Sequence, residues 1–140
     1  MITGASGDIG SAICLSLTDF PGPLTLGLHY SEQRKNITRL QERIHRKNTR
    51  VKTILLKANL LLENERQSLI PRFVRQAGSI DALVNNAGAI YGRTDFLHLT
   101  KVDWDKTFEL NSSAPFFLAQ QAFPHMKKTR GGKIINISYI

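Results

Sequence analysis

The sequence alternates between two hydrophobic periods, and this alternation limits the possible fold more than any other feature. Short apolar or alternating runs, bounded by Gly, Pro, Asn or Asp, predict strands at residues 24–30, 51–56, 80–84 and 133–137. The segments between them carry apolar side chains at helical spacing, which predicts one buried face per helix. Because parallel strands need right-handed crossovers, the pattern predicts a doubly wound α/β domain with helices on both faces of a parallel sheet. The positions at helical spacing are Ile9, Ile13 and Leu17; Ile37, Leu40 and Ile44; Leu69, Phe73, Val74 and Ala77; and Phe108, Ser112, Phe116, Ala119 and Phe123.

The length and composition fit one globular domain spanning residues 1–140. A chain of 140 residues buries roughly two thirds of its unfolded surface, so its core needs no disulfide or structural metal. The single Cys14 and four scattered His offer no metal-ligand spacing, which predicts no metal site and favours a reducing compartment. No apolar run approaches the roughly 18 residues of a membrane span, and the first eight residues lack a signal pattern. We therefore expect a cytoplasmic protein without a membrane partner.

The net charge of +8 is concentrated in one segment. Residues 31–52 hold eight basic and two acidic side chains, so this segment alone carries +6. Such a stripe is either a solvated helix face or an electrostatic contact for nucleic acid. Tyr30 is the only aromatic residue nearby, which leaves no platform for stacked bases. A solvated face is favoured, and a basic RNA-associated protein is the weakest alternative.

Residues 3–10, with the sequence TGASGDIG, place glycines at three-residue spacing directly before the first predicted helix. Gly permits a tight turn and a close approach of the backbone to a ligand, and a helix N-terminus offers free N–H groups to a phosphate. The pattern by itself fits equally well a plain turn in which Gly10 packs against a strand. It predicts a phosphate-binding turn and leaves a purely structural turn open.

A second small polar loop, Asn85-Asn86-Ala87-Gly88, follows the predicted strand at 80–84. In an open parallel sheet, ligands bind at the carboxyl ends of the strands where the strand order reverses. The strands before the two loops flank that point, so both loops are predicted to converge on one crevice. A simple strand exit with a left-handed Gly is the structural alternative, but it does not explain the shared chemistry of the two loops.

Four motifs, in this order, resemble those of the short-chain dehydrogenase/reductase family, and they cover essentially the whole chain. They are Thr3-Gly4-Ala5-Ser6 with Ile9-Gly10, Asn85-Asn86-Ala87-Gly88, Trp104-Asp105 leading to Asn111, and Gly132-Lys133-Ile134-Ile135-Asn136-Ile137-Ser138. The resemblance implies a Rossmann-like sheet with strand order 3-2-1-4-5, in which residues 1–3 form the first strand. It also implies hydride transfer between a nicotinamide dinucleotide and a carbonyl or alcohol substrate, and a homo-oligomer for a full-length form.

The coenzyme contacts implied by the resemblance fall into three groups. Asn59 stands where the family often has an Asp, and its amide can still form hydrogen bonds there. Asp8 stands where many members have Gly, and a carboxylate facing a pyrophosphate would be repelled. The groups are Gly4, Ser6, Asp8, Ile9 and Gly10 at the pyrophosphate; Asn86, Ala87 and Gly88 at the adenosine ribose and towards the nicotinamide; and Asn59 with Leu60 at the adenine.

The end of the strand at 24–30 governs the choice of coenzyme, because an acidic residue there would bind a ribose 2′-OH and repel a 2′-phosphate. Tyr30 and Ser31 occupy this turn, and Arg34 follows one helical turn later. NADP(H) is therefore favoured over NAD(H), with Tyr30, Ser31 and Arg34 as contacts. The neighbouring Glu32 weakens this inference.

Asn111 and Ser138 match catalytic positions of the family. The resemblance implies that Asn111 orders a water in a proton relay, and that Ser138 or the next residue helps to orient the substrate carbonyl. Pro115 removes a backbone donor inside the last helical segment, at a cost of about 3 kcal/mol, which predicts a bend just after Asn111. A polar residue on the exposed side of a helix is the alternative for Asn111.

Two features predict a chain truncated at both ends relative to the family fold. The family's proton donor is a Tyr followed four residues later by a Lys, and none of Tyr30, Tyr91 or Tyr139 has that Lys. The residues before Gly4 are too few for a central strand of about five to six residues. Residues 133–137 are then left as an uncovered sheet edge that favours aggregation. A sharp monomer peak in size-exclusion chromatography at micromolar concentration would contradict this expectation.

The leading interpretation is therefore part of an NAD(P)(H)-dependent oxidoreductase that retains most of its dinucleotide site. Without a positioned acid, hydride transfer loses roughly 10²- to 10⁴-fold in rate, so coenzyme binding is expected to survive where turnover does not. The main alternative is a non-catalytic dinucleotide-binding or regulatory module.

Overall fold

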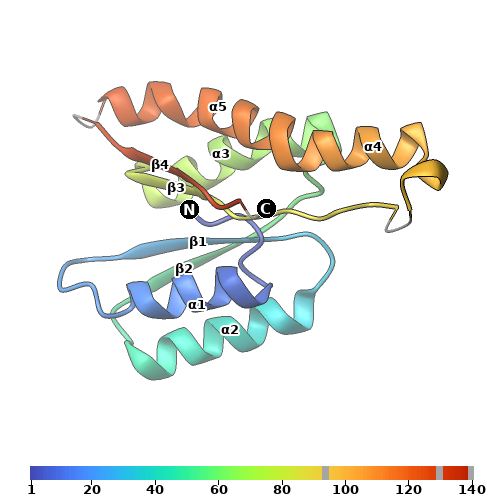
Figure 1. Ribbon diagram of the computed structural model, residues 1–140. Coiled ribbons are helices and arrows are strands. Elements are labelled where there is room, and N and C mark those ends of the chain that lie inside the picture. The colour runs from blue at the N-terminus through green and yellow to red at the C-terminus, as the bar shows by residue number, and fades with distance from the viewer. Residues whose placement is uncertain (93–94, 129–130, 139–140) are drawn as a thin grey trace.

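In the computed structural model, which describes residues 1–92, 95–128 and 131–138, helices cover both faces of one parallel sheet (Figure 1). The α/β class is confirmed, and each predicted strand agrees with an observed one to within two residues at either end. The strands are β1 (Thr25–Tyr30), β2 (Lys52–Lys57), β3 (Ala82–Asn85) and β4 (Lys133–Asn136). The helices are α1 (Asp8–Leu17), α2 (Arg34–Lys47), α3 (Glu63–Ala77), α4 (Lys101–Phe108) and α5 (Ala114–Lys128), with a 3₁₀ turn η1 (Phe96–His98) before α4 and a π-helical turn η2 (Glu109–Ser113) before α5.

Residues 1–3 join two strand pairs into one sheet. β1 pairs in parallel with β2, and β3 pairs in parallel with β4. Ile2 bridges both Leu28 and Val84, and the N–H of Thr3 donates to the carbonyl oxygen of Val84 at 2.9 Å. The strand order is therefore β2, β1, residues 1–3, β3, β4, which confirms the predicted order 3-2-1-4-5 with the segment 1–3 as the central strand.

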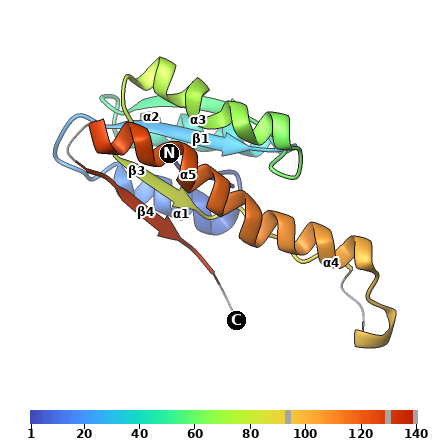
Figure 2. The ribbon, with the colours of Figure 1, turned by 90° about the horizontal axis from the view of Figure 1, so that it is seen from above.

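Two apolar clusters fill the space between the sheet and its helices. On the α1–α2 face, residues of α1, α2 and β1 pack together, Cys14 and Leu28 among them. On the α3–α5 face, residues of β2, α3, β3 and α5 pack together, Leu69 and Leu118 among them. Seen from above, α5 lies along β3, whereas α4 extends beyond the sheet (Figure 2).

Helices α2 and α3 bury the positions that the hydrophobic period predicts. Ile37, Leu40 and Ile44 of α2 are buried, as are Leu69 and Phe73 of α3. Every Lys and Arg of α2 is exposed. The basic residues of the stripe that lie in α2 therefore form an exposed helix face, as both interpretations of the stripe require.

The predicted buried face of α5 is wrong, and in α1 the prediction fails at Ile9, whereas Ile13 and Leu17 are partly buried against the core. Ile9 is 58% exposed, and Phe116 and Phe123 are 63% and 61% exposed. Both helices instead turn a row of mostly smaller residues towards the sheet, because small side chains let a helix axis approach its neighbours closely. The buried residues are Gly10 and Cys14 in α1, and Ala114, Leu118, Ala122 and Met126 in α5.

Pro115 does not end the helix in which it lies. The irregularity predicted just after Asn111 takes the form of the π-helical turn η2, in which the N–H of Ala114 donates to the carbonyl oxygen of Glu109. Such a turn widens the helix locally and is frequent at functional sites. The helical path therefore continues from α4 through η2 into α5.

β4 lies at one edge of the sheet, and its side chains are exposed. Ile134 and Ile135 retain 39% and 44% of their accessible surface. Within residues 1–92, 95–128 and 131–138, no strand pairs with the outer side of β4. Aggregation through this edge stays a prediction.

The described helices include none that is long and apolar enough to cross a membrane. In the same part of the chain, no three or more His, Cys, Asp or Glu side chains lie where they could hold a metal ion together.

Candidate functional site

The glycine turn (residues 4–7) and the asparagine loop (residues 86–88) lie side by side at the carboxyl edge of the sheet. Thr3 Oγ1 accepts hydrogen bonds from the N–H groups of Asn86 and Ala87, each 2.9 Å long. In return, Asn86 Nδ2 donates to the carbonyl oxygens of Thr3 at 3.0 Å and Gly4 at 3.2 Å. The two loops converge as predicted. Because the side-chain amide of Asn86 already binds Thr3 and Gly4, a ligand would contact the backbone of the asparagine loop.

Gly4 and Gly10 make this close approach possible. Gly4 has a φ of +63°, and a Cβ on it would lie 2.9 Å from Ala87 Cα. A Cβ on Gly10 would collide with the carbonyl oxygen of Gly4 and lie 2.8 Å from Asn86 Nδ2. Any side chain at either position would therefore push the start of α1 away from the two loops. A Cβ on Gly7, in contrast, would make only an ordinary contact of 3.5 Å.

The start of α1 leaves its backbone donors free. Gly7 is the N-cap and provides no side-chain hydrogen bond. Among the described residues, the N–H groups of Ser6, Asp8, Ile9 and Gly10 form no hydrogen bond. The side chains of Asp8 and Ile9 are exposed. Free donors at the positive end of a helix dipole form a site for an anion.

His29 holds the glycine turn from the neighbouring strand, and the sequence patterns did not single it out. Its Nδ1 accepts from the N–H of Gly4 at 3.1 Å, and its Nε2 lies 3.0 Å from the carbonyl oxygen of Ala58. The ring must therefore carry its proton on Nε2. Burial lowers the pKa of His29 from 6.5 to about 4, so the ring is neutral at physiological pH. A lone His in an apolar strand gives no local signal of this role.

Asn59 and Leu60 follow β2 at the same edge of the sheet. Asn59 Oδ1 accepts from the N–H of Leu61 at 3.1 Å, and the N–H of Asn59 donates to Glu65 Oε2 at 2.7 Å. Leu60 is buried in the cluster of the α3–α5 face, and its carbonyl oxygen accepts from Arg66 Nη1. These contacts leave Asn59 Nδ2 for a ligand, whereas the Leu60 side chain belongs to the core.

Tyr30, Ser31 and Arg34 lie at the carboxyl end of β1. Tyr30 is 4% exposed and packs in the cluster of the α1–α2 face, so its ring is not presented at the surface. Ser31 and Arg34 are exposed, and Arg34 is the first residue of α2. The first turn of α2 contains no acidic residue, although Glu32 is exposed just before it. The carboxyl end of β1 therefore presents to a ligand the hydroxyl group of Ser31, the guanidinium group of Arg34 and the N-terminus of α2.

Asn111 lies against the asparagine loop. Its Nδ2 donates to the carbonyl oxygens of Ala89 at 2.6 Å and Thr107 at 2.7 Å. A Cβ on Gly88 would lie 2.7 Å from Asn111 Oδ1. Asn111 is exposed, as the alternative interpretation expects, but its amide is fixed beside the predicted crevice.

Ser138 follows β4 at the same edge. The N–H of Ile137 donates to the carbonyl oxygen of Asn85, the last residue of β3, at 2.8 Å. This bond places Ser138 one residue beyond the paired strands, and its side chain is exposed. Tyr139, the alternative position for a substrate-orienting group, lies outside the described residues.

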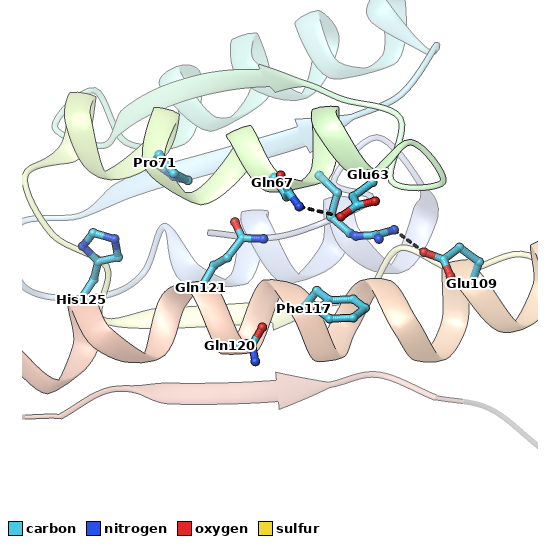
Figure 3. Close-up of a pocket in the computed structure, with 9 residues that line it drawn as sticks. Glu63, Gln67, Pro71, Glu109, Phe117, Gln120, Gln121 and His125 are labelled. Carbon is cyan, nitrogen blue, oxygen red and sulfur yellow. Dashed lines mark hydrogen bonds and ion pairs between the residues drawn. The ribbon is translucent and has the colours of Figure 1, made fainter.

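A groove of about 680 Å³ lies between α3 and α5, and none of the predicted coenzyme contacts lines it (Figure 3). Arg66 of α3 pairs with Glu109 of η2 and lies 5.3 Å from the centre of the Phe117 ring. Gln121 and His125 of α5 line the same groove. These contacts connect α3 to the helical segment η2–α5 and make the groove part of the packing of the α3–α5 face.

The parallel sheet, its strand order and the uncapped helix beside its switch point define a doubly wound domain of the Rossmann type. Residues 1–140 match the family model described as short chain dehydrogenase, and the chain belongs to this family.

The relatives agree with this assignment. The 3-oxoacyl-[acyl-carrier-protein] reductase FabG of Staphylococcus aureus strain Mu50 is 31% identical over 140 residues, which cover 100% of this chain and 55% of that protein. The chain thus spans about half the length of the curated relatives it matches.

Two solved structures share the fold. One is the NADH-dependent reductase A1-R′ complexed with NAD, with a TM-score of 0.87 and 23% identity, covering 99% of this chain and 58% of that one. The other is a metagenomic short-chain oxidoreductase in complex with NADP, with a TM-score of 0.85 and 24% identity, covering 99% of this chain and 61% of that one.

Proposed function

We propose that this chain forms the coenzyme-binding part of an NAD(P)(H)-dependent oxidoreductase that transfers hydride between nicotinamide and a carbonyl or alcohol substrate. The observation that carries the proposal is the uncapped start of α1, where backbone donors lie free beside the asparagine loop. A pyrophosphate is an anion suited to such donors. Gly4 and Gly10 let the start of α1 pack closely against the two loops, which places its free donors at the crevice, so the residues present fit a dinucleotide.

Each part of the coenzyme has proposed partners on the carboxyl edge. The bound coenzyme supplies or accepts the hydride, and the chain's own residues hold it. The pyrophosphate would accept hydrogen bonds from the N–H groups of Ser6, Asp8, Ile9 and Gly10. The backbone of Asn86, Ala87 and Gly88 would line the ribose, and Asn59 Nδ2 would face the adenine with Leu60 behind it in the core.

On the substrate side, Asn111 and Ser138 are proposed to act through positioning. Because Nδ2 of Asn111 is engaged by two carbonyl oxygens, its Oδ1 is the atom that would accept a hydrogen bond from a water. The exposed hydroxyl of Ser138 would donate to a substrate carbonyl oxygen. No Tyr of the 140 residues has a Lys four positions later, so we expect this chain alone to bind coenzyme and to turn over slowly or not at all.

We also propose that NADP(H) is preferred over NAD(H). Arg34 stands exposed at the start of α2, with no acidic residue in that first turn. A guanidinium beside a helix N-terminus stabilises a phosphate, and a carboxylate at the end of β1, which would select a free 2′-OH, is absent. Glu32 acts against this preference and makes it moderate.

Calorimetric titration of the 140-residue chain with NADPH and NADH tests both proposals. We expect NADPH to bind more tightly, and Arg34→Ala to weaken NADPH binding about tenfold while leaving NADH binding unchanged. Arg39→Ala is the matched control, because Arg39 is also exposed on α2 but lies beyond its first turn. Absence of heat with both coenzymes on well-folded protein would refute the function, and equal affinities would refute the preference.

A non-catalytic dinucleotide-binding module is the second candidate, because the free donors at the start of α1 serve coenzyme binding whether or not hydride transfer follows. Coenzyme binding without NADPH oxidation in the full-length protein, across a panel of carbonyl compounds, would support it. For the oxidoreductase we propose a small-molecule carbonyl or alcohol as the substrate and a homo-oligomer for the full-length form. We also propose a cytoplasmic location, which the buried free thiol of Cys14 supports.

A further inference from the structure

His29 contacts both sides of the proposed coenzyme crevice. The residue is 2% exposed and lies in β1, next to the central segment 1–3. On one side, its Nδ1 accepts from the N–H of Gly4, the first residue of the glycine turn. On the other, its Nε2 lies 3.0 Å from the carbonyl oxygen of Ala58, the residue directly before Asn59. The ring therefore spans the distance between the pyrophosphate turn and the adenine-side loop.

The main chain of His29 strengthens this arrangement. Its carbonyl oxygen accepts from the N–H of Ala5 at 2.8 Å, and its N–H donates to the carbonyl oxygen of Ile2 at 3.0 Å. The first two N–H groups of the turn, those of Gly4 and Ala5, are thus used by one residue. The N–H of Ser6 is therefore the first free donor of the turn. The contacts of His29 determine this position, because they occupy the two N–H groups before it.

Gly4 shows why this matters for the geometry. Its φ of +63° reverses the chain direction between the central segment and α1. Glycine has wide freedom at this point, so the conformation needs an external contact to select it. The hydrogen bond to His29 Nδ1 is one such contact, because it fixes the Gly4 N–H from a rigid, buried strand, while Asn86 Nδ2 holds the Gly4 carbonyl oxygen.

We propose that His29 is a positioning residue for coenzyme binding, which holds the glycine turn and the adenine-side loop at a fixed separation through the two nitrogens of its ring. The inference rests on the proposed function. It concerns a residue that would not touch the coenzyme but would act through Gly4 and Ala58.

Two substitutions test the two hydrogen bonds of the His29 ring separately. His29→Asn keeps an acceptor, Oδ1, at the δ position that faces Gly4, and loses the donor to Ala58. His29→Gln keeps a donor at the ε position and loses the acceptor for Gly4. Both variants lose the ring's packing, so their losses of thermal stability should be similar, and the difference between them isolates the hydrogen bond to the glycine turn.

The test is NADPH titration of wild type, His29→Asn and His29→Gln, with amide hydrogen exchange of Gly4 measured in the coenzyme-free proteins. We expect a dissociation constant about tenfold higher for His29→Gln and within about threefold of wild type for His29→Asn. Exchange of the Gly4 amide should accelerate in His29→Gln alone. A merely structural role would move both variants equally.

The outcomes distinguish this inference from the proposed function. If wild type binds NADPH and both variants bind with equal affinity, the role of His29 is refuted and the proposed function stands. If folded wild type binds no dinucleotide, the function is refuted, and the coenzyme role of His29 with it. If neither variant folds, the ¹⁵N spectrum of the wild-type imidazole decides, since a proton found on Nδ1 at pH 7 would overturn the proposal.

Discussion

The two faces of the sheet are filled in different ways. On the α1–α2 face, α2 turns aliphatic side chains such as Ile44 to the sheet and exposes all of its Lys and Arg. On the α3–α5 face, α5 turns Ala114 and Leu118 inwards and leaves Phe116 and Phe123 exposed.

The α3–α5 face also holds buried polar groups. Arg66 pairs with Glu109, and Asn85 Nδ2 donates to Asn136 Oδ1 at 2.9 Å. Because strand side chains alternate and Leu28 belongs to the α1–α2 cluster, His29 faces the α3–α5 side as well.

The difference shows when hydrophobic spacing identifies a core. In α2 one side is charged, so the apolar side has to be the buried one. In α5 both sides carry apolar residues. The buried side is the one whose smaller residues allow the helix to pack closer to its neighbours. Alanines allow contact with β3 and α3 that phenylalanines would prevent. A helix with two apolar sides therefore needs its neighbours before its buried side can be assigned.

The largest expected effect comes from the two sides of α5. Leu118→Ala should lower the free energy of unfolding by about 3 kcal/mol, because Leu118 is 1% exposed and a cavity would remain. Phe123→Ala should lower it by less than about 1 kcal/mol, since most of that ring is in solvent. Urea unfolding of both variants measures the difference. A larger loss for Phe123→Ala would invalidate the assignment of the buried side.

The buried titratable group on the α3–α5 face predicts acid sensitivity. The pKa of His29 is lowered from 6.5 to about 4 by burial, so between these values the unfolded chain binds a proton that the folded chain does not. The free energy of unfolding should be unaffected by this group above pH 6.5. It should fall by up to about 3 kcal/mol as the pH drops to 4. His29→Asn removes this group, so unfolding curves of the variant should lose that part of the pH dependence, and an unchanged slope would contradict the prediction.

The buried thiol on the α1–α2 face predicts sensitivity to alkaline pH instead, with a smaller change in the free energy of unfolding. Burial raises the pKa of Cys14 from 9.0 to about 12, so above pH 9 the unfolded thiol loses its proton while the folded one keeps it. This difference lowers the free energy of unfolding by about 1 kcal/mol at pH 10. Cys14→Ala is the control that should lack this decline.

The same burial predicts slow thiol chemistry. In the native protein at pH 8, the Cys14 thiol should react with an aromatic disulfide far more slowly than after unfolding, and a rapid reaction would show that the α1–α2 face is open to solvent.

The elements and their succession along the chain could be predicted because they depend on local patterns. The apolar runs at 24–30 and 51–56 correspond to β1 and β2, and the crossover rule then leaves few arrangements for a parallel sheet. The glycine turn and the asparagine loop were also identified from short segments. Their residue types, small and polar after a strand, are the local requirement of a backbone that approaches a ligand.

Contacts between distant segments could not be predicted in this way. The ring of His29 meets Gly4 and Ala58 across 25 and 29 residues, and nothing in the strand around it differs from an ordinary apolar run. The ring of Tyr30 is buried although it was assigned to the coenzyme, because alternation along β1 turns it to the α1–α2 face.

The sequence by itself determined the α/β class and the two loops, because periodicity and glycine geometry are properties of consecutive residues. Its four motifs implied the family and, through the family, the strand order. Only the tertiary structure decided which sides of α1 and α5 are buried, where the rings of His29 and Tyr30 lie, and how Asn111 is fixed beside Gly88. Those outcomes depend on packing distance and on hydrogen-bond partners from other strands and helices, which come together only when the sheet assembles.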